Sequence, residues 1–499
     1  MNKKTIVGAL LIFVISLSYF ALLQFSTPKV LYEPDSYYHI KLAEMIRDHG
    51  PIQNFPWAQY SVLGKDTFAD FDFLFHLLLI PFTFAGLIFG IKLAGVIFPA
   101  ILVTILYLII AKRELPFPFF WAVSIFASGF FFTHRMMYVR PYLISIPLSL
   151  LIVDAIIDKK EIKLFILTFL FSWTYVMSVL SVVYALVFVF VYAIKKEQFP
   201  LKVLFSAIGG WLIGFVAHPN FPNTLKAMFT RLFFTTASSW GNINMSAGVE
   251  MMPMTTRIFF VDLGYVLVLF VGLIYVLMMY KKEISATSNC LILISTVFFV
   301  GTLMSRRVVE YSVPFSLYTC AFLCRDLIKN AKAPQGPFRY KSLLAGRTPI
   351  AVMIVLVLFS VFSVKTFARD YNYIAKERGD LVEKGALWLK DNSEEKDIVF
   401  NCGWDNFAQL LFSNTKNYYI VGLDPTYIYM YNRGLWVKWD MIRKGARKDI
   451  YDVVKNDFNA KWIFTMNTNN RRQFIKIADQ DPNLERVYFD GNSIIYKLR

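Results

Sequence analysis

The sequence predicts an α-helical polytopic membrane protein, with about eleven spans plus interfacial helices, that ends in a C-terminal extracytoplasmic α/β domain. Two observations support this fold class. The chain has 499 residues, of which 56% are hydrophobic and 17% aromatic, and its mean hydropathy is +0.48. Its apolar residues also come in runs of about 18–22, the length that an α-helix needs to cross a bilayer.

The first apolar run, at about residues 5–26, is expected to be an uncleaved signal anchor. Lys3 and Lys4 precede it and place the N-terminus in the cytoplasm, and no small-residue cleavage site follows it. The net charge of +17 is carried mostly by short loops between apolar runs, where the positive-inside rule puts basic residues. The charge therefore indicates membrane topology, and no nucleic-acid partner is expected.

A first outer loop is expected over residues 27–91, and it opens with the segment Glu33-Pro34-Asp35. Two carboxylates two residues apart at a membrane surface can hold a divalent cation, act as a base, or both. Residues 36–48 follow with apolar side chains at helical spacing, which predicts an amphipathic helix. Asp35 or Ser36 is expected to cap that helix.

Residues 73–91 are apolar but contain a histidine, a proline and two glycines, and two topologies are open. If they cross the membrane, Lys112 and Arg113 lie outside and every later loop changes side. If they lie in the interface, the second span is about 92–111 and all later basic loops fall in the cytoplasm, which favours this alternative. The remaining spans are then expected at about 116–133, 141–157, 162–176, 178–194, 202–217, 257–280, 286–304, 308–324 and 348–366.

The chain changes character near residue 370, so we divide it into a transmembrane domain, 1–369, and an extracytoplasmic domain, 370–499. Short β-rich runs predict strands at 398–400, 418–421 and 462–464, and helices are expected at 440–456 and 470–479. Asp490-Gly491-Asn492, between two more β-rich runs, predicts a hairpin.

Several charged residues are expected at the outer ends of spans, where such groups usually have a partner or a task. They are Asp70 and Asp72 near the interfacial helix, Arg135 and Arg140 after the third span, and Arg306 and Arg307 before the tenth. Carboxylates beside arginines suit the binding of a metal ion together with a phosphate or diphosphate. The alternative is structural, because arginines also extend to lipid headgroups and acid–arginine pairs also hold helices together.

In its order of parts the chain resembles the GT-C superfamily of membrane glycosyltransferases. It is similar especially to the oligosaccharyltransferase catalytic subunits and their bacterial and archaeal relatives. Gly403-Trp404-Asp405-Asn406-Phe407 matches the WWDYG signature of those subunits at Trp404 and Asp405 only. Arg306-Arg307 looks like the family's late-span arginine, and His134-Arg135 stands where a second acidic motif is expected.

The resemblance implies an inverting glycosyltransferase of the GT-C type in the cell membrane. It would move a sugar or oligosaccharide from a polyprenyl phosphate or diphosphate to a glycan, lipid or protein acceptor at the outer face. Two alternatives stay open: an oligosaccharyltransferase that acts on protein, and a lipid-linked-sugar flippase or transporter without transferase activity. The flippase would need neither the acidic pair nor a folded outer domain of this size.

The resemblance and the charge pattern together assign roles to individual side chains. Asp35 and Glu33 are the expected catalytic residues, and both, with Asp70 and Asp72, are expected to hold Mg²⁺ or Mn²⁺. The donor phosphate is expected at Arg307, Arg306, Arg135 and Arg140, and the acceptor at Trp404, Asp405, Tyr38 and His39. An outer loop at 218–256, which contains Trp240-Gly241-Asn242, is expected to order over the substrate.

Overall fold

The computed structural model describes residues 2–26, 33–235, 248–279, 283–331, 348–374, 376 and 381–499. These residues form two compact units, which we describe separately. The helical unit contains the described residues of 2–26, 92–215 and 248–376. The sheet unit contains the described residues of 33–91, 216–235 and 381–499, so it combines the C-terminal sheet with α2, α3 and α11.

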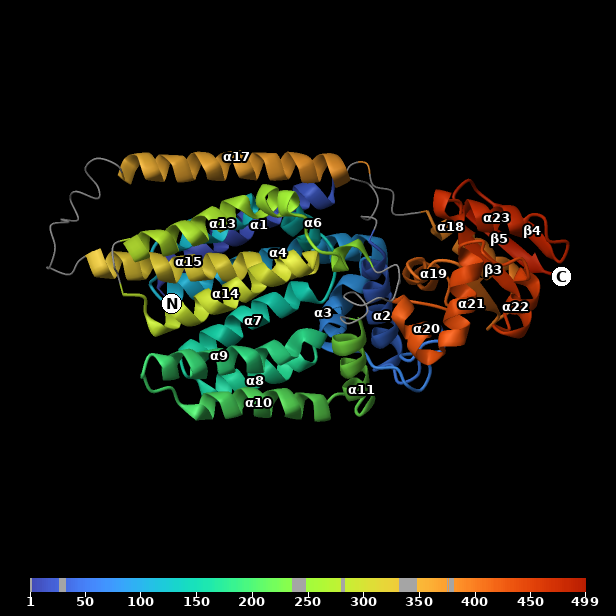
Figure 1. Cartoon of the computed structure of the whole chain (residues 1–499), viewed down its shortest axis with the longest axis horizontal. Coiled ribbons are helices and arrows are strands. Elements are labelled where there is room, and N and C mark those ends of the chain that lie inside the picture. The colour runs from blue at the N-terminus through green and yellow to red at the C-terminus, as the bar shows by residue number, and fades with distance from the viewer. Residues whose placement is uncertain are drawn as a thin grey trace. The chain divides into compact units, whose positions relative to one another are not determined.

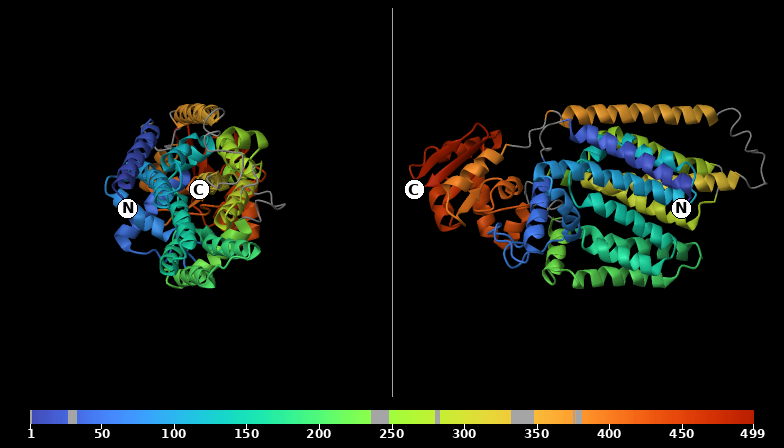
Figure 2. Two further views of the ribbon diagram at one scale, coloured as in Figure 1. Left: turned by 90° about the vertical axis from the view of Figure 1, so that its left-hand side faces the viewer. Right: turned by 180° about the vertical axis from the view of Figure 1, so that it is seen from behind.

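The long helices of the helical unit run side by side, as both views in Figures 1 and 2 show. They are α1 (Lys3–Gln24), α4 (Leu87–Lys112), α7 (Tyr142–Ile157), α8 (Glu161–Ser172), α9 (Leu180–Ile194), α10 (Leu201–Val216), α13 (Thr256–Met279), α14 (Ala286–Met304), α15 (Val309–Ala331) and α17 (Thr348–Ile374). Among the described residues, five helices are long and apolar enough to cross a membrane: α1, α4, α13, α14 and Val176–Ile194. Several shorter apolar helices accompany them, and eleven crossings remain a prediction.

The span expected at 116–133 is not one continuous helix, because the chain there is broken into three short helices, and its crossing of the membrane stays a prediction. These are α5 (Pro118–Val123), the 3-10 turn η1 (Ser124–Ala127) and α6 (Phe130–Met136). Gly129 lies at the second break with φ of +92°. A Cβ added there would lie 2.0 Å from the carbonyl oxygen of Asp262, so the close approach of α13 requires glycine.

In the sheet unit, α2 (Pro34–His49) and α3 (Phe73–Thr83) pack against each other, and α11 (Asn223–Phe229) leads into the π-helix η3 (Thr230–Thr235). The expected cap of α2 is wrong: Glu33 is the N-cap, and its carboxylate accepts from the backbone N–H groups of Asp35 and Ser36. Pro34 occupies the first helical position and has no N–H group. The cap therefore serves the N–H groups of the next two residues. At 11 residues, α3 is about 16 Å long, too short to cross the hydrocarbon core alone.

The C-terminal part of the sheet unit holds a five-stranded sheet of order β2-β1-β3-β5-β4. Its strands are β1 (Ile398–Asn401), β2 (Tyr418–Tyr419), β3 (Trp462–Met466), β4 (Leu484–Phe489) and β5 (Ser493–Leu498). β1 pairs in parallel with β2 and β3, whereas β5 pairs antiparallel with β3 and β4 and thereby confirms the predicted hairpin.

Helices connect these strands and cover the sheet, whose buried core includes Phe400, Trp439 and Phe474. They are α18 (Glu383–Asn392), α19 (Phe407–Ser413), α20 (Pro425–Tyr431), α21 (Arg433–Arg443), α22 (Ile450–Asn456) and α23 (Arg472–Ala478), and the turn η6 (Asn469–Arg471) precedes α23. The single helix expected at 440–456 is wrong. Gly445, with φ of +69°, separates α21 from α22.

The loop between α2 and α3 joins the edge of this sheet. Backbone N–H groups of Gln59 and Tyr60 donate to the carbonyls of Tyr419 and Ile420, and Tyr419 donates to the carbonyl of Trp57. Residues 57–60 therefore run beside β2 as an additional edge segment. Because of this pairing, the acidic segment at α2 and the C-terminal sheet belong to one packed unit.

Asn401 is expected to be essential for the stability of this sheet. Its buried side chain donates to the carbonyls of Gly403 and Val421, at 2.9 and 2.7 Å, and accepts from the N–H groups of Ile420 and Val421. Asn401→Ala would leave these buried groups unpaired and cost about 3 kcal/mol or more. Resistance of the C-terminal domain to proteolysis during heating of the full-length protein measures this loss.

The matched control for that measurement is Asn392→Ala. The Asn392 side chain is exposed and makes one bond, 2.8 Å to the carbonyl of Trp388. Its loss is expected to cost less than about 1 kcal/mol. Equal melting of the two variants would contradict the role assigned to Asn401.

Candidate functional site

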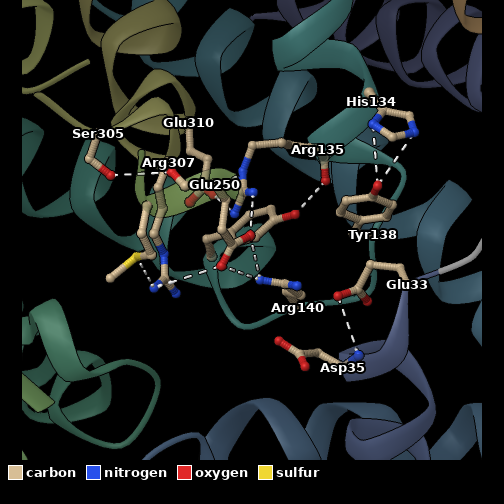
Figure 3. Close-up of polar contacts among 12 residues, drawn as sticks. Glu33, Asp35, His134, Arg135, Tyr138, Arg140, Glu250, Ser305, Arg307 and Glu310 are labelled. Atoms are coloured by element: carbon tan, nitrogen blue, oxygen red, sulfur yellow. Dashed lines mark hydrogen bonds and ion pairs between the residues drawn. The ribbon is translucent and has the colours of Figure 1, made fainter. Parts of the chain in front are cut away.

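The acidic segment at the start of α2 separates its two carboxylates. Glu33 is buried and accepts hydrogen bonds from Ser36, 2.7 Å from the backbone nitrogen and 2.6 Å from the hydroxyl. A further bond from the Asp35 backbone nitrogen, 3.3 Å long, is drawn in Figure 3. Asp35 lies in the first turn of α2 and is half-buried. Glu33 thus has a structural task, and Asp35 sits where the partial positive charge of the helix N-terminus favours a carboxylate.

Asp70 is bound to two histidines in a buried chain of hydrogen bonds. Its Oδ2 lies 2.7 Å from Nδ1 of His76, and Nε2 of His76 lies 2.8 Å from Nδ1 of His39. All three side chains are at most 5% exposed. Asn220 accepts from the backbone of Asp70 and holds the loop in place. This chain links α2 to α3.

Asp72 faces Arg231, a residue that the sequence analysis did not select. Arg231 Nη1 lies 3.7 Å from Asp72 Oδ2, and its Nε donates to the hydroxyl of Tyr427 at 2.7 Å. Arg231 lies in the π-helix η3, a form of helix that is often found at functional sites. The expected acceptor residue Tyr38 lies nearby and is buried, and burial together with Asp70 raises its phenol pKa well above the usual value. Tyr38 is therefore a neutral hydrogen-bonding group.

The four carboxylates expected to hold Mg²⁺ or Mn²⁺ do not form a ligand set in this arrangement. Glu33 caps α2, Asp70 is bonded to His76, and Asp72 faces Arg231. Within the described ranges, no three side chains of His, Cys, Asp or Glu converge in a way that could hold a metal ion. The described residues therefore offer no converging donor set for a divalent cation, and the proposed reaction does not rely on one.

In the helical unit, three arginines gather around two glutamates (Figure 3). Arg135 in α6 forms an ion pair with Glu310 at the start of α15 and contacts Glu250 Oε2 at 2.7 Å. Arg140 Nη1 lies 3.0 and 2.9 Å from the two oxygens of Glu250, and Arg307 Nη1 lies 4.0 Å from Oε1. This arginine cluster therefore brings together three guanidinium groups and two carboxyl groups.

Glu250, in the turn η4 (Val249–Met251), is the centre of the cluster and was also missed by the sequence analysis. Burial by itself would raise the pKa of its carboxyl, but Arg140, Arg135 and Arg307 outweigh burial and hold the pKa well below its usual range. The carboxylate is thus ionised and receives several guanidinium donors, which is how proteins bind phosphate. An acidic residue in the loop before α13 was the only sequence signal for it.

The fourth expected arginine, Arg306, is separate from this cluster. Its Nε donates to the carbonyl of Pro253 at 3.3 Å, and its guanidinium lies over the ring of Phe131. Arg307, the next residue, donates instead to the hydroxyl of Tyr175 at 3.0 Å. The two neighbours therefore have different environments, with only Arg307 directed to the glutamates.

Trp404 and Asp405 lie in the turn that follows β1, at the carboxyl end of the parallel strands. In the sheet, β1 lies between β2 and β3, and the chain passes from β1 to β2. Ligands of open α/β sheets often bind at the carboxyl end of a strand in such a position. Both side chains are half-buried, and Trp404 packs on the core of the sheet. Trp240-Gly241-Asn242, in the loop that was expected to order over the substrate, lies outside the described residues.

Comparison with known proteins identifies the fold. No protein-family model and no curated protein matches the chain. Among solved structures, the oligosaccharyltransferase of Archaeoglobus fulgidus has a TM-score of 0.64 at 12% identity and covers 92% of this chain and 69% of its own. ArnT from Cupriavidus metallidurans has a TM-score of 0.56 at 9% identity, with 99% and 97% covered.

A mycobacterial arabinofuranosyltransferase, AftD, has a TM-score of 0.55 at 12% identity over 97% of this chain and 40% of its own. All three are GT-C glycosyltransferases. The chain therefore has the fold of the GT-C membrane glycosyltransferases, which confirms the resemblance seen in the sequence. It is similar over nearly its whole length to ArnT and over most of its length to the archaeal oligosaccharyltransferase.

Proposed function

We propose that this protein is an inverting glycosyltransferase that moves a sugar or oligosaccharide from a polyprenyl phosphate or diphosphate to an acceptor at the outer face of the membrane. The arginine cluster is the observation that carries the proposal. Three guanidinium groups around an ionised glutamate make a phosphate-type site in a protein with the GT-C fold. Solved structures of two similar proteins contain lipid phosphates: dolichol-phosphate in the archaeal enzyme and undecaprenyl phosphate in ArnT.

In this proposal the donor phosphate binds Arg135, Arg140 and Arg307 and displaces Glu250. With Glu250 withdrawn, the guanidinium groups of the three arginines are available to the negative charge of a diphosphate or of a departing phosphate. The cluster thus stabilises negative charge that grows on the leaving group. Arg306, which does not contact the glutamates, has at most a long-range electrostatic role.

Asp35 is the proposed catalytic base. It accepts the proton of the acceptor hydroxyl while the acceptor oxygen attacks the anomeric carbon and the bond to the lipid phosphate breaks. One displacement inverts the anomeric carbon and needs no covalent nucleophile. Glu33 supports this step by holding the first turn of α2, on which Asp35 sits. Trp404 and Asp405 contact the acceptor in this proposal, and Tyr38 positions it through the packing of α2.

A dependence on Mg²⁺ or Mn²⁺ stays a prediction of the sequence that the described carboxylates do not support. Transfer assays with EDTA, followed by addition of each cation, test it directly. Whether the acceptor is a glycan, a lipid or a protein is decided by offering each class in turn to the reconstituted enzyme.

The deciding experiment uses the purified protein in liposomes that contain a radiolabelled lipid-linked sugar. We expect label to move to a water-soluble or lipid acceptor, with release of the polyprenyl phosphate. Movement of the labelled lipid between leaflets without cleavage would instead support the flippase alternative. Comparison of cell glycans by mass spectrometry, with and without the protein, identifies the acceptor and the donor to use.

The proposed topology predicts which side of the membrane each unit's surface loops occupy. Glu395 is 77% exposed on the C-terminal domain, and Lys160 is exposed between α7 and α8. We expect a membrane-impermeant maleimide to label Glu395→Cys in intact cells and Lys160→Cys only after permeabilisation. The native cysteines are buried except Cys324, which is partly exposed, so Cys324→Ser provides the background. The reverse labelling pattern would invert the proposed orientation.

A further inference from the structure

The two glutamates of the arginine cluster are held in different ways. Glu310 belongs to the first turn of the long helix α15, and its side chain is 1% exposed. Glu250 lies in the three-residue turn η4, and its side chain is 23% exposed. The neighbouring side chain of Arg307 is 32% exposed. Glu310 is therefore the enclosed member of the cluster, whereas Glu250 lies on its accessible side.

Glu250 occupies the guanidinium groups that the donor phosphate is proposed to bind (Figure 3). Its Oε2 accepts from Arg135 at 2.7 Å and from Arg140 at 2.9 Å, and its Oε1 accepts from Arg140 at 3.0 Å. An N–H group that donates to Glu250 is not available to a phosphate oxygen. The carboxylate and a phosphate therefore exclude each other at these arginines.

The Glu250 carboxylate is charged and stays within reach of the arginines. Burial opposes its charge, but Arg140, Arg135 and Arg307 outweigh burial and hold its pKa well below the usual range. The hydroxyl of Ser305 donates to the backbone carbonyl of Glu250 at 3.3 Å, which ties η4 to the segment between α14 and α15. The side chain can therefore leave the arginines and return by rotation while its backbone stays in place.

We propose that Glu250 is a tethered competitor for the phosphate site. It covers the arginines in the empty enzyme, turns away when the donor phosphate binds, and returns after sugar transfer to displace the polyprenyl phosphate product. Loss of the bond to the sugar adds negative charge to the phosphate and strengthens its contacts with the arginines, so the product would otherwise leave slowly. This inference rests on the function proposed above and adds a part for Glu250 in product release.

The exchange between Glu250 and a phosphate lowers the apparent affinity for the lipid. A ligand binds only the fraction of molecules in which Glu250 has turned away, and its apparent affinity falls by that fraction. Donor and product bind the same arginines, so both are weakened by the same factor. Product release limits the turnover of many enzymes, and weaker binding of the product then speeds each cycle.

Binding of undecaprenyl phosphate to the full-length protein in phosphatidylcholine nanodiscs tests the competition without turnover. Glu250→Gln removes the charge and keeps the size of the side chain, so we expect binding to be at least about tenfold tighter than in the wild type. Glu250→Asp keeps the charge and should tighten binding much less. Equal or weaker binding by the glutamine variant would mean that Glu250 holds the arginines in place. Equal tightening by both variants would mean that side-chain size and not charge blocks the site, and either result overturns the proposal.

Glu197→Gln is the matched control, since Glu197 is exposed in the segment between α9 and α10 and its change should leave binding unaltered. Electron cryo-microscopy of the wild-type protein with undecaprenyl phosphate needs no substitution and tests the displacement itself. We expect the phosphate at Arg140, with the Glu250 carboxylate turned away. A phosphate bound at Arg140 while Glu250 keeps its contacts there would overturn the competition.

The kinetics of transfer give a readout that a purely structural role of Glu250 would not move. In Glu250→Gln, the KM for the donor and the inhibition constant of undecaprenyl phosphate should fall by the same factor. At saturating donor the first turnover should keep the wild-type rate and later turnovers should be slower, so that product appears in a burst. Equal slowing of the first and the later turnovers would contradict a role in product release.

Failure of the proposed function has a different signature. In that case neither the wild type nor Glu250→Gln binds undecaprenyl phosphate, and the wild type transfers no label. If the wild type binds the lipid and transfers label while the glutamine variant gains no affinity, the phosphate site stands and only the competition fails.

Discussion

Asp35→Asn is expected to reduce sugar transfer by a factor of about 10²–10⁴, the usual contribution of a general base. Asparagine has almost the same shape and can still lie in the first turn of α2, but it cannot accept the acceptor's proton. Because the donor contacts arginines elsewhere, binding of the lipid-linked sugar should be nearly unchanged. Initial rates of label transfer in liposomes and separate measurement of donor binding check both parts.

Asp48→Asn is the matched control, since Asp48 lies on the same helix, is exposed and pairs only with its neighbour Arg47. Glu33→Gln should lower the rate much less than Asp35→Asn, because the amide oxygen can still accept from the backbone N–H groups that Glu33 caps. Full transfer by the Asp35 variant, or an equal loss in the Glu33 variant, would contradict the assignment of the base to Asp35.

Arg140→Ala is expected to cost about 10²–10³ in transfer rate and to weaken the binding of polyprenyl phosphate. This is the loss typical of one donor that stabilises charge in a transition state. Arg140 contacts both carboxylate oxygens of Glu250. Arg135, by contrast, divides its guanidinium between Glu250 and Glu310. Rates with saturating donor and binding of undecaprenyl phosphate to the purified protein are the measurements.

Arg307→Lys tests the geometry of the same cluster. Lysine keeps the charge but loses the planar fork that reaches Tyr175 and Glu250 together, so we expect a loss of about tenfold or more. Arg257→Ala is the control, because Arg257 is exposed at the start of α13 and has no place in the cluster. If Arg140→Ala and Arg257→Ala bind polyprenyl phosphate equally well, the arginine cluster is a helix-to-helix lock and not a phosphate site.

Glu250 explains why the arginine cluster was only half visible in the sequence. The arginines stand out there because charges at the ends of apolar runs are rare. Glu250 is 110 residues or more from Arg135 and Arg140 in the chain, and nothing local marks it as their counter-ion. Only the tertiary structure, which places Glu250 of η4 against Arg135 and Arg140, brings the opposite charges together.

The buried hydrogen-bonded chain Asp70–His76–His39 shows the same limit on prediction. The bond from His39 to His76 joins residues 37 apart, across the contact of α2 with α3. Which carboxylate caps α2 likewise depends on where the backbone turns into the helix. Either carboxylate of the motif could have filled this role, and the structure places Glu33 there.

By itself, the sequence determined that this is a multi-pass helical membrane protein with an α/β domain at its C-terminus. Apolar runs of membrane length and a Gly-containing hairpin are local signals, because burial in lipid and turn geometry act on neighbouring residues. Only the tertiary structure determined that the helix breaks at Gly129, which carboxylates already have a hydrogen-bond or ion-pair partner, and which arginines contact the same glutamate. Those outcomes depend on contacts between residues far apart in the chain, and such contacts leave no periodic or compositional trace in the sequence.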